Sequence, residues 1–339
     1  MRLEKFNSYT MEKCYAVNAT KYKGHKVFLV AAEKSGDCCV FDEQGNYMET
    51  VWKGPSGTMS IVPLPDLRGG FLASRDFYSP NDSEAARIVA ALPGETGWTI
   101  HQIASLPFVH RFDVVQRNGF RYAVAATIKS QQDHKDDWSH PGKVYVAPFP
   151  TDTRAWIEAG GHLEFQAVAD HLTHNHGYLR RSGTFVIGAD EGIFEFVVPE
   201  TPELPWNVQR LVSDSTSDMV FSDLDGDGEE EIVAISPFHG DQITIYKRED
   251  GRYKPVYRHP QPLEFAHAIW ATRVGGRNVV LVGNRKGERA ITAFAYENGA
   301  FTARTLATLL GSANFWSDGN VLVATNREID EIGFYRLMD

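Results

Sequence analysis

The stretch Asn278-Val-Val-Leu-Val-Gly283 decides the fold, because short apolar runs of this kind recur along the whole chain. Such runs, bounded by Gly, Asn, Asp or Pro, are typical of β-strands, and no segment shows a sustained helical period. The seven clearest runs are residues 27–32, 70–74, 121–127, 184–188, 231–236, 278–283 and 321–325. The chain is therefore predicted to be all-β.

The runs mark a repeated unit of four strands, in which each run is the second strand. Their spacing averages about 50 residues, which is typical of the blades of a β-propeller. The first six units end in an outer strand, for example at residues 47–52, 98–103, 208–212 and 302–306. The seventh unit stops one strand short after residues 334–337, whereas residues 2–6 precede the first unit.

These observations predict a seven-bladed β-propeller that forms a single domain over residues 1–339, with the N-terminal strand completing the last blade. Such closure removes the open sheet edges. A pair of β-sandwiches is the alternative, but it does not explain seven units of similar length. Six or eight blades are further alternatives.

Composition narrows the classes of partner and compartment. The chain has 339 residues with a formal net charge of −10, and it has no cluster of Lys and Arg, so nucleic acid is not an expected partner. No leader-like or membrane-spanning apolar run is found, which predicts a cytoplasmic protein without a membrane partner. Cys14, Cys38 and Cys39 are too few for a disulfide framework and are expected to be buried thiols.

One turn carries an acidic loop, Asp223-Leu-Asp225-Gly-Asp227-Gly-Glu-Glu-Glu231. Acidic side chains at positions 1, 3, 5 and 9 suit Ca²⁺, which prefers several oxygen ligands, although the flanking strands exclude an EF-hand. The loop resembles the FG-GAP or VCBS repeat, a propeller blade that binds calcium at this turn. Only residues 217–246 carry the full motif. The resemblance implies a structural calcium ion held by Asp223, Asp225, Asp227 and Glu231; the alternative is an empty, solvated loop.

Three histidines occupy equivalent places in different units. His110, His176 and His267 each lie at the start of an innermost strand, and these strands line the central channel of a propeller. We therefore expect the three imidazoles to converge on the axis and to bind Zn, Mn, Fe or Ni, with His174 and His239 as additional ligands. For each histidine taken alone, a structural role is the alternative.

The loops at the same end of the predicted propeller are rich in polar and aromatic residues. The segment 130–143 is the best candidate for a lid, with a solvated surface loop as its alternative. We predict Tyr78, His140 and Tyr178 as acid or base residues. Arg75, Lys129, Trp138 and Arg285 are the predicted substrate-binding residues, because cations bind carboxylates and aromatic rings stack on sugars.

The overall pattern resembles propeller-type carbohydrate lyases and dehydratases, including oligogalacturonate lyase and the propeller domain of aldos-2-ulose dehydratase. The resemblance rests on the propeller type and on the histidine-rich rim, without a catalytic signature that matches residue by residue. It implies a metal-dependent elimination of water or an alcohol from a sugar acid or keto-sugar. An epimerase or isomerase would need the same groups. The alternative from another class is a non-catalytic propeller that binds a sugar or a protein. The sequence does not indicate an oligomeric state.

Overall fold

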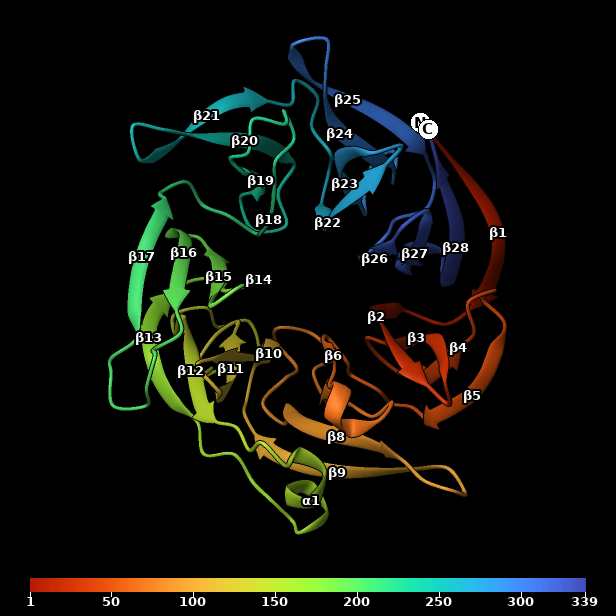
Figure 1. The fold of residues 1–339 in the computed structure, drawn as a ribbon, viewed down its shortest axis with the longest axis vertical. Coiled ribbons are helices and arrows are strands. Elements are labelled where there is room, and N and C mark those ends of the chain that lie inside the picture. Colours follow the sequence, from red (N-terminus) through yellow and green to blue (C-terminus); the bar gives the residue numbers. More distant parts are fainter.

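The computed structural model describes residues 1–339 and confirms the seven-bladed β-propeller, with seven four-stranded sheets arranged in a ring (Figure 1). The strands of blades 1 to 3 are β2 (Cys14–Tyr22), β3 (His25–Ala32), β4 (Cys38–Phe41), β5 (Tyr47–Trp52), β6 (Ile61–Pro63), β7 (Phe71–Arg75), β8 (Arg87–Pro93), β9 (Trp98–Ser105), β10 (Val109–Arg117), β11 (Phe120–Thr127), β12 (Gly142–Pro148) and β13 (Gln166–Leu172).

Blades 4 to 7 continue around the ring in the same order, from the innermost strand outward. Their strands are β14 (Gly177–Arg181), β15 (Thr184–Ala189), β16 (Gly192–Val197), β17 (Asn207–Val212), β18 (Asp218–Ser222), β19 (Glu231–Ser236), β20 (Gln242–Glu249), β21 (Arg252–Arg258), β22 (Ala266–Val274), β23 (Arg277–Asn284), β24 (Ile291–Glu297), β25 (Ala300–Ala307), β26 (Asn314–Asp318), β27 (Val321–Asn326), β28 (Glu331–Met338) and β1 (Arg2–Thr10).

The predicted apolar runs coincide with the second strand of every blade. Each blade lies between two others, so both faces of its second strand are covered and the apolar residues run continuously instead of alternating. In β3, for example, every residue from Val27 to Ala32 is at most 1% exposed. The cores between the blades therefore account for the pattern that is visible in the sequence.

The ring closes as predicted, with β1 as the outer strand of blade 7. β1 pairs antiparallel with β28 from Arg2 opposite Met338 to Thr10 opposite Glu331, with an irregularity between Lys5 and Asn7. Both chain ends lie beside blade 7 (Figure 1). The last blade is thus built from the two ends of the chain, which holds blade 7 against blade 1.

Helical structure is limited to three short segments that the sequence pattern did not indicate. They are the α-helix α1 (Thr153–Glu158) and the 3₁₀ turns η1 (Pro65–Leu67) and η2 (Arg327–Ile329). Helix α1 begins after Asp152, whose carboxylate accepts a hydrogen bond from the Ala155 backbone N–H, as an N-cap residue does. A six-residue helix is too short to produce a detectable period.

All three cysteines are free and buried, as predicted. Burial raises the pKa of the Cys39 thiol to about 11, so the protonated form prevails at neutral pH. None of the helices is long and apolar enough to cross a bilayer.

Candidate functional site

Four of the seven blades share a backbone feature at the start of their innermost strands. Lys13, Phe108, His174 and Phe265 adopt positive φ angles of 48–62°, and each stands two residues before a side chain at the start of an inner strand. These four side chains are Tyr15, His110, His176 and His267. At Tyr15, His110 and His267 the pairing with the second strand also shifts by one residue. Such bulges re-aim side chains, and they are common next to active sites.

His176, His239 and His267 form the histidine cluster, in which the candidate ligand atoms all lie within 4.8 Å of one another. Blades 4 and 6 contribute His176 and His267, whereas His239 lies in the loop between β19 and β20 of blade 5. The structure thus brings together three of the five predicted metal ligands.

Backbone carbonyls orient two of the rings. Nδ1 of His267 lies 2.8 Å from the Ala313 carbonyl oxygen, and Nδ1 of His176 lies 3.2 Å from that of Ser217. If each Nδ1–H donates to its carbonyl, each Nε2 carries a lone pair, which is the usual support for a metal-binding histidine. The lone pair of His267 faces the Tyr15 hydroxyl, 3.2 Å away. The Nε2 atoms of His176 and His239 are buried and have no hydrogen-bond partner. The cluster therefore fits a metal ion.

Burial keeps these imidazoles neutral. Desolvation lowers the pKa of His239 to about 3, and it holds the pKa values of His176 and His267 well below the usual range. The positive charge of Arg285 lowers the pKa values of His239 and His267 further. Because only the neutral ring binds a metal, the candidate ligands are in the state that metal binding would require at physiological pH.

The other two predicted ligands lie beside the cluster. The ring centroid of His110 is 4.4 Å from that of His176, and Nδ1 of His110 is buried without a hydrogen-bond partner. His174 instead points Nδ1 at Asp190 Oδ2, 2.6 Å away, and stacks on Phe238 with a centroid distance of 4.4 Å. His174 is thus engaged with a carboxylate, whereas His110 is available for another role.

Sequence reasoning missed Tyr15. Its buried hydroxyl lies 3.2 Å from Nε2 of His267, and burial raises its pKa above the usual value. Tyr15 occupies in blade 1 the place that His110 and His267 occupy in blades 3 and 6. A search for any polar residue at that position, and not for histidine alone, would have found it.

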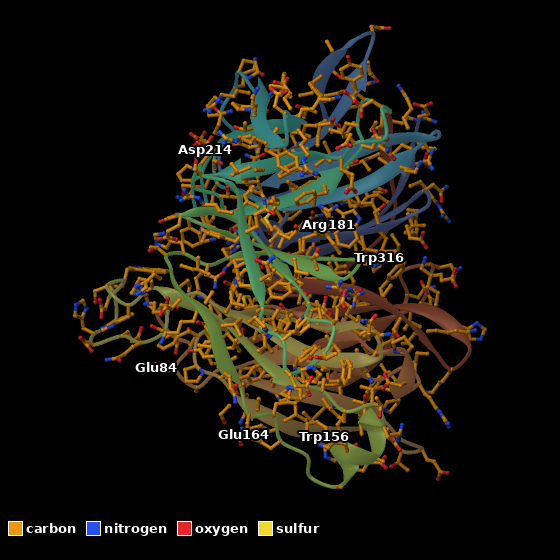
Figure 2. All side chains as sticks on the ribbon, turned by 60° about the vertical axis from the view of Figure 1, so that its left-hand side comes forward. Glu84, Trp156, Glu164, Arg181, Asp214 and Trp316 are labelled. Carbon is orange, nitrogen blue, oxygen red and sulfur yellow. The ribbon has the colours of Figure 1, made fainter.

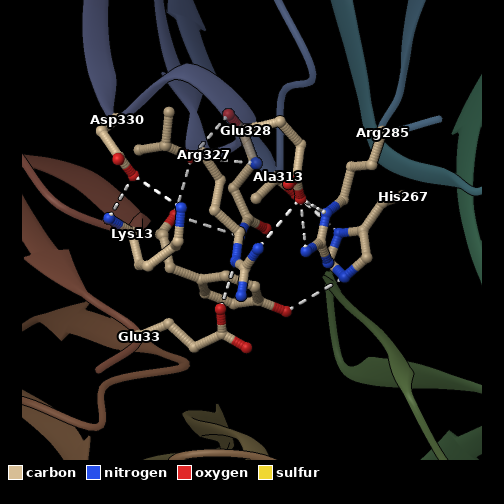
Figure 3. Close-up of polar contacts among 11 residues, drawn as sticks. Lys13, Glu33, His267, Arg285, Ala313, Arg327, Glu328 and Asp330 are labelled. Carbon is tan, nitrogen blue, oxygen red and sulfur yellow. Dashed lines mark hydrogen bonds and ion pairs between the residues drawn. The ribbon is translucent and has the colours of Figure 1, made fainter. Parts of the chain in front are cut away.

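A chain of ion pairs borders the cluster where blades 6, 7 and 1 meet (Figure 3). The Arg285 guanidinium lies 2.7 Å from Glu328, which also pairs with Arg327 at 2.9 Å. Arg327 in turn pairs with Glu33 of blade 1. Arg285 therefore lies beside His267 with its orientation fixed by Glu328, and its role in substrate binding stays a prediction.

The predicted lid, residues 130–143, folds over a buried lysine. The Lys129 ammonium donates to Asn81 Oδ1 at 2.8 Å and to the Asp137 carbonyl at 2.7 Å, and it lies 4.4 Å from the Trp138 ring centroid. Trp138 reaches the His174 ring, at a centroid distance of 4.6 Å. Trp138 thus lies next to the histidine region, whereas Lys129 is committed to holding the loop.

The remaining predicted residues are engaged elsewhere. His140 lies 3.3 Å from Asp133 on the exposed part of the loop. Arg75 donates to the Pro55 carbonyl at 2.9 Å, and Tyr78 donates to Asp76 at 2.9 Å. Tyr178 lines a channel cavity of about 380 Å³ whose lining includes no histidine. The structure does not bring these four residues together with the cluster.

The carboxylates of the acidic loop also converge, but they surround the ammonium group of a lysine. Carboxylate oxygens of Asp223, Asp225 and Glu231 lie within 4.8 Å of one another. The Lys247 ammonium contacts Asp225, lies 2.7 Å from Asp227 and lies 3.5 Å from Glu231. Hydrogen bonds with Asp225 and Asp227 raise the Lys247 pKa, so this amine stays charged. The oxygen ligands suit calcium, but the ion would have to displace the ammonium.

Replacing that ammonium should make the loop dependent on calcium. In Lys247→Gln the carboxylates lose their counter-ion, so we expect a lower Tm than that of the wild type in chelator and recovery in millimolar calcium. The wild type should respond weakly, because the ammonium competes. Differential scanning fluorimetry of both proteins measures this, with Lys254→Gln as the control on an exposed lysine of the same blade. A Lys247→Gln protein that calcium does not stabilise contradicts the expectation.

Comparison with known proteins supports the fold and no closer relationship. No family model matches the sequence, and no curated protein matches it. A chain of the mitotic checkpoint complex aligns over 99% of this chain and 95% of its own, at a TM-score of 0.64 and 10% identity. The computationally designed Ika8 protein aligns over 98% of both chains, at a TM-score of 0.53 and 11% identity.

Two bacterial structures are provisionally assigned as 6-phosphogluconolactonases. The one from Bacteroides uniformis shares 15% identity at a TM-score of 0.56 and covers 95% of this chain and 91% of its own. The one from Bacteroides fragilis shares 12% identity at a TM-score of 0.57. Its alignment covers 91% of this chain and 86% of its own. A checkpoint component, a designed protein and sugar-related proteins thus share one architecture. The comparisons show a β-propeller and do not show membership of the FG-GAP or lyase families.

Proposed function

We propose that this protein is a metal-dependent, carbohydrate-active enzyme that eliminates water or an alcohol from a sugar acid or keto-sugar. The observation that carries the proposal is the histidine cluster. One ring nitrogen of each histidine lies within 4.8 Å of the other two, two rings are oriented by backbone carbonyls, and the Nε2 atoms of His176 and His239 have no partner. A set of three neutral imidazoles with open positions suits a catalytic divalent ion.

The neighbouring groups suit proton transfer beside such an ion. When bound, the metal would supply a Lewis acid that polarises a substrate carbonyl or carboxylate. His110, whose buried Nδ1 has no hydrogen-bond partner, is the candidate base for the proton on the adjacent carbon. The electron pair of that C–H bond becomes the new C=C bond as the C–O bond breaks. Tyr15 is the candidate acid that protonates the departing oxygen.

The site also offers charge and an aromatic surface for an acidic sugar. The Arg285 guanidinium lies next to His267 and is paired with Glu328, and Trp138 lies beside His174. Carboxylate recognition by Arg and stacking by Trp are usual for uronates and related ligands. These contacts favour a sugar acid over a neutral sugar.

Lactone hydrolysis is the second candidate. It is suggested by the names of the two Bacteroides structures, which share only the fold with this chain. The same cluster would activate water for attack on the lactone carbonyl. Elimination creates a double bond conjugated with a carboxylate, which absorbs in the ultraviolet, whereas hydrolysis only releases acid. The two reactions are therefore separable in one screen.

The test is metal analysis of the purified protein by mass spectrometry. We expect about one transition metal ion per chain and a loss of about tenfold or more in His176→Ala and His267→Ala, because each variant removes a ligand. His25→Ala, on an exposed histidine at the start of β3, is the control and should keep the metal. Metal-loaded protein is then screened with uronates, keto-sugars and lactones, with Tyr15→Phe expected to keep the metal and lose turnover. Wild-type protein without a transition metal would overturn the proposal and favour a binding scaffold.

A further inference from the structure

A cationic groove separates blades 4 and 5 on the outer wall of the ring, away from the histidine cluster. It has a volume of about 750 Å³, which is within the range of small-molecule sites. The lining contains five arginines, Arg181, Arg210, Arg248, Arg252 and Arg258, but only two carboxylates, Glu195 and Asp214. In a chain of net charge −10, this concentration of one sign is local and not a property of the whole surface.

The lining reaches the innermost strands of both blades, through Arg181 of β14 and Phe221 of β18. Phe221 and Tyr246, the latter on β20 of blade 5, are buried there. The Arg181 guanidinium lies 3.9 Å from the Phe221 ring centroid and pairs with Glu230, so its charge is compensated. Figure 2 labels Arg181 and Asp214, which both belong to this lining.

Of the four arginines on the walls of the groove, three have no ion-pair partner. The exception is Arg258, which lies 3.5 Å from Asp214, whose carboxylate also accepts a hydrogen bond from the Tyr246 hydroxyl at 2.7 Å. Arg210 on β17, Arg248 on β20 and Arg252 on β21 have no ion-pair partner. Three guanidinium groups thus line one groove from both blades with their charge uncompensated.

We propose that this groove binds a small ligand bearing two or more phosphate groups. Guanidinium groups pair bidentately with tetrahedral oxyanions, and several uncompensated charges in one concave site favour a multiply charged anion. The ring of Tyr253, in the same lining, offers a face on which a planar group can stack. The site does not depend on the proposed elimination activity, because its residues are not shared with the histidine cluster.

Isothermal titration calorimetry of the full-length protein tests the proposal, with inorganic diphosphate as the probe and citrate as a polycarboxylate of similar charge. We expect one site per chain that binds diphosphate at least about tenfold more tightly than citrate. Arg210→Gln/Arg252→Gln should weaken diphosphate binding by about tenfold or more. Arg252→Lys should also weaken it, because lysine keeps the charge but loses the planar fork.

Arg304→Gln is the matched control, since Arg304 is an exposed arginine on β25, the outer strand of blade 6. It should leave the affinity unchanged. Equal weakening by Arg304→Gln, or equal binding of citrate, would overturn the proposal, as would the absence of binding at physiological salt. Because the substituted arginines are exposed and unpaired, unchanged Tm values verify that the variants fold.

Discussion

Deletion of residues 1–10 is expected to remove most of the stability of the protein. Strand β1 pairs with β28 from Arg2 to Thr10, and its aromatic side chains pack across the junction of blades 7 and 1. The Phe6 ring is 6.3 Å from that of Phe334, and the Tyr9 ring is 5.0 Å from that of Phe41. About six lost hydrogen bonds at ~1 kcal/mol each and two aromatic side chains at ~2 kcal/mol each give roughly 10 kcal/mol. This is comparable to the whole free energy of unfolding of a typical protein.

The measurement is urea denaturation of the full-length and truncated chains, followed by tryptophan fluorescence. Truncation should leave no cooperative transition, because the freed edge of β28 opens the ring. A synthetic peptide of residues 1–10 should restore the transition by strand addition, and a scrambled peptide should not. A truncated chain with an unchanged midpoint would show that the closure contributes little.

The blade pattern and the closure were predictable from the sequence for a physical reason. Second strands such as β3 are covered on both faces, so their apolar runs are continuous and their spacing counts the blades. The unpaired first and last strands then had only each other as partners. Propeller geometry likewise placed His176 and His267 at one end of the channel, because the start of every inner strand lies there.

Other features of the candidate sites could not be predicted from the sequence, because they depend on how far a side chain reaches and on local backbone geometry. The left-handed conformations of Lys13 and Phe265 re-aim the residues that follow, and no propensity rule assigns that conformation to a Lys or a Phe. The contact of Lys247 with the acidic loop joins positions far apart in the sequence through a flexible side chain. Similarly, Tyr78 and Arg75 resembled site residues by composition, but their nearest partners are Asp76 and the Pro55 carbonyl.

Acid should destabilise the protein steeply below about pH 6.5, because the core of the site holds four neutral histidines, three of them buried and His239 half-buried. Burial lowers the pKa of His239 to about 3, and it holds the pKa values of His110, His176 and His267 well below the usual range. In the unfolded chain these residues take up protons near pH 6.5, whereas in the folded protein they do not. The unfolded state therefore binds more protons between about pH 3 and 6.5, so stability falls as the pH drops through this window.

The expected slope follows from counting protons. Four suppressed protonations would reduce the free energy of unfolding by about 5 kcal/mol per pH unit, at 1.36 kcal/mol for each proton. Asp218 reduces this loss of stability. Burial raises its pKa to about 7, so the folded protein holds a proton on this carboxyl where the unfolded chain does not. Burial raises the pKa of Asp113 in the same direction. With Asp218 counted as one proton, a net loss of roughly 4 kcal/mol per pH unit remains, and Asp113 reduces it further.

Urea midpoints measured from pH 7.5 to 4.5 in the presence of chelator test this slope without a contribution from bound metal. His110→Gln is the informative variant, because His110 is not one of the three histidines whose ring nitrogens converge and glutamine does not titrate. We expect the variant to flatten the dependence by about 1.4 kcal/mol per pH unit, whereas His25→Gln should leave it unchanged. A wild-type stability that stays constant between pH 6.5 and 5 would mean that the four rings accept protons in the folded state. The cluster would then be too hydrated to hold its imidazoles neutral, and the metal site proposed for it would lose its electrostatic basis.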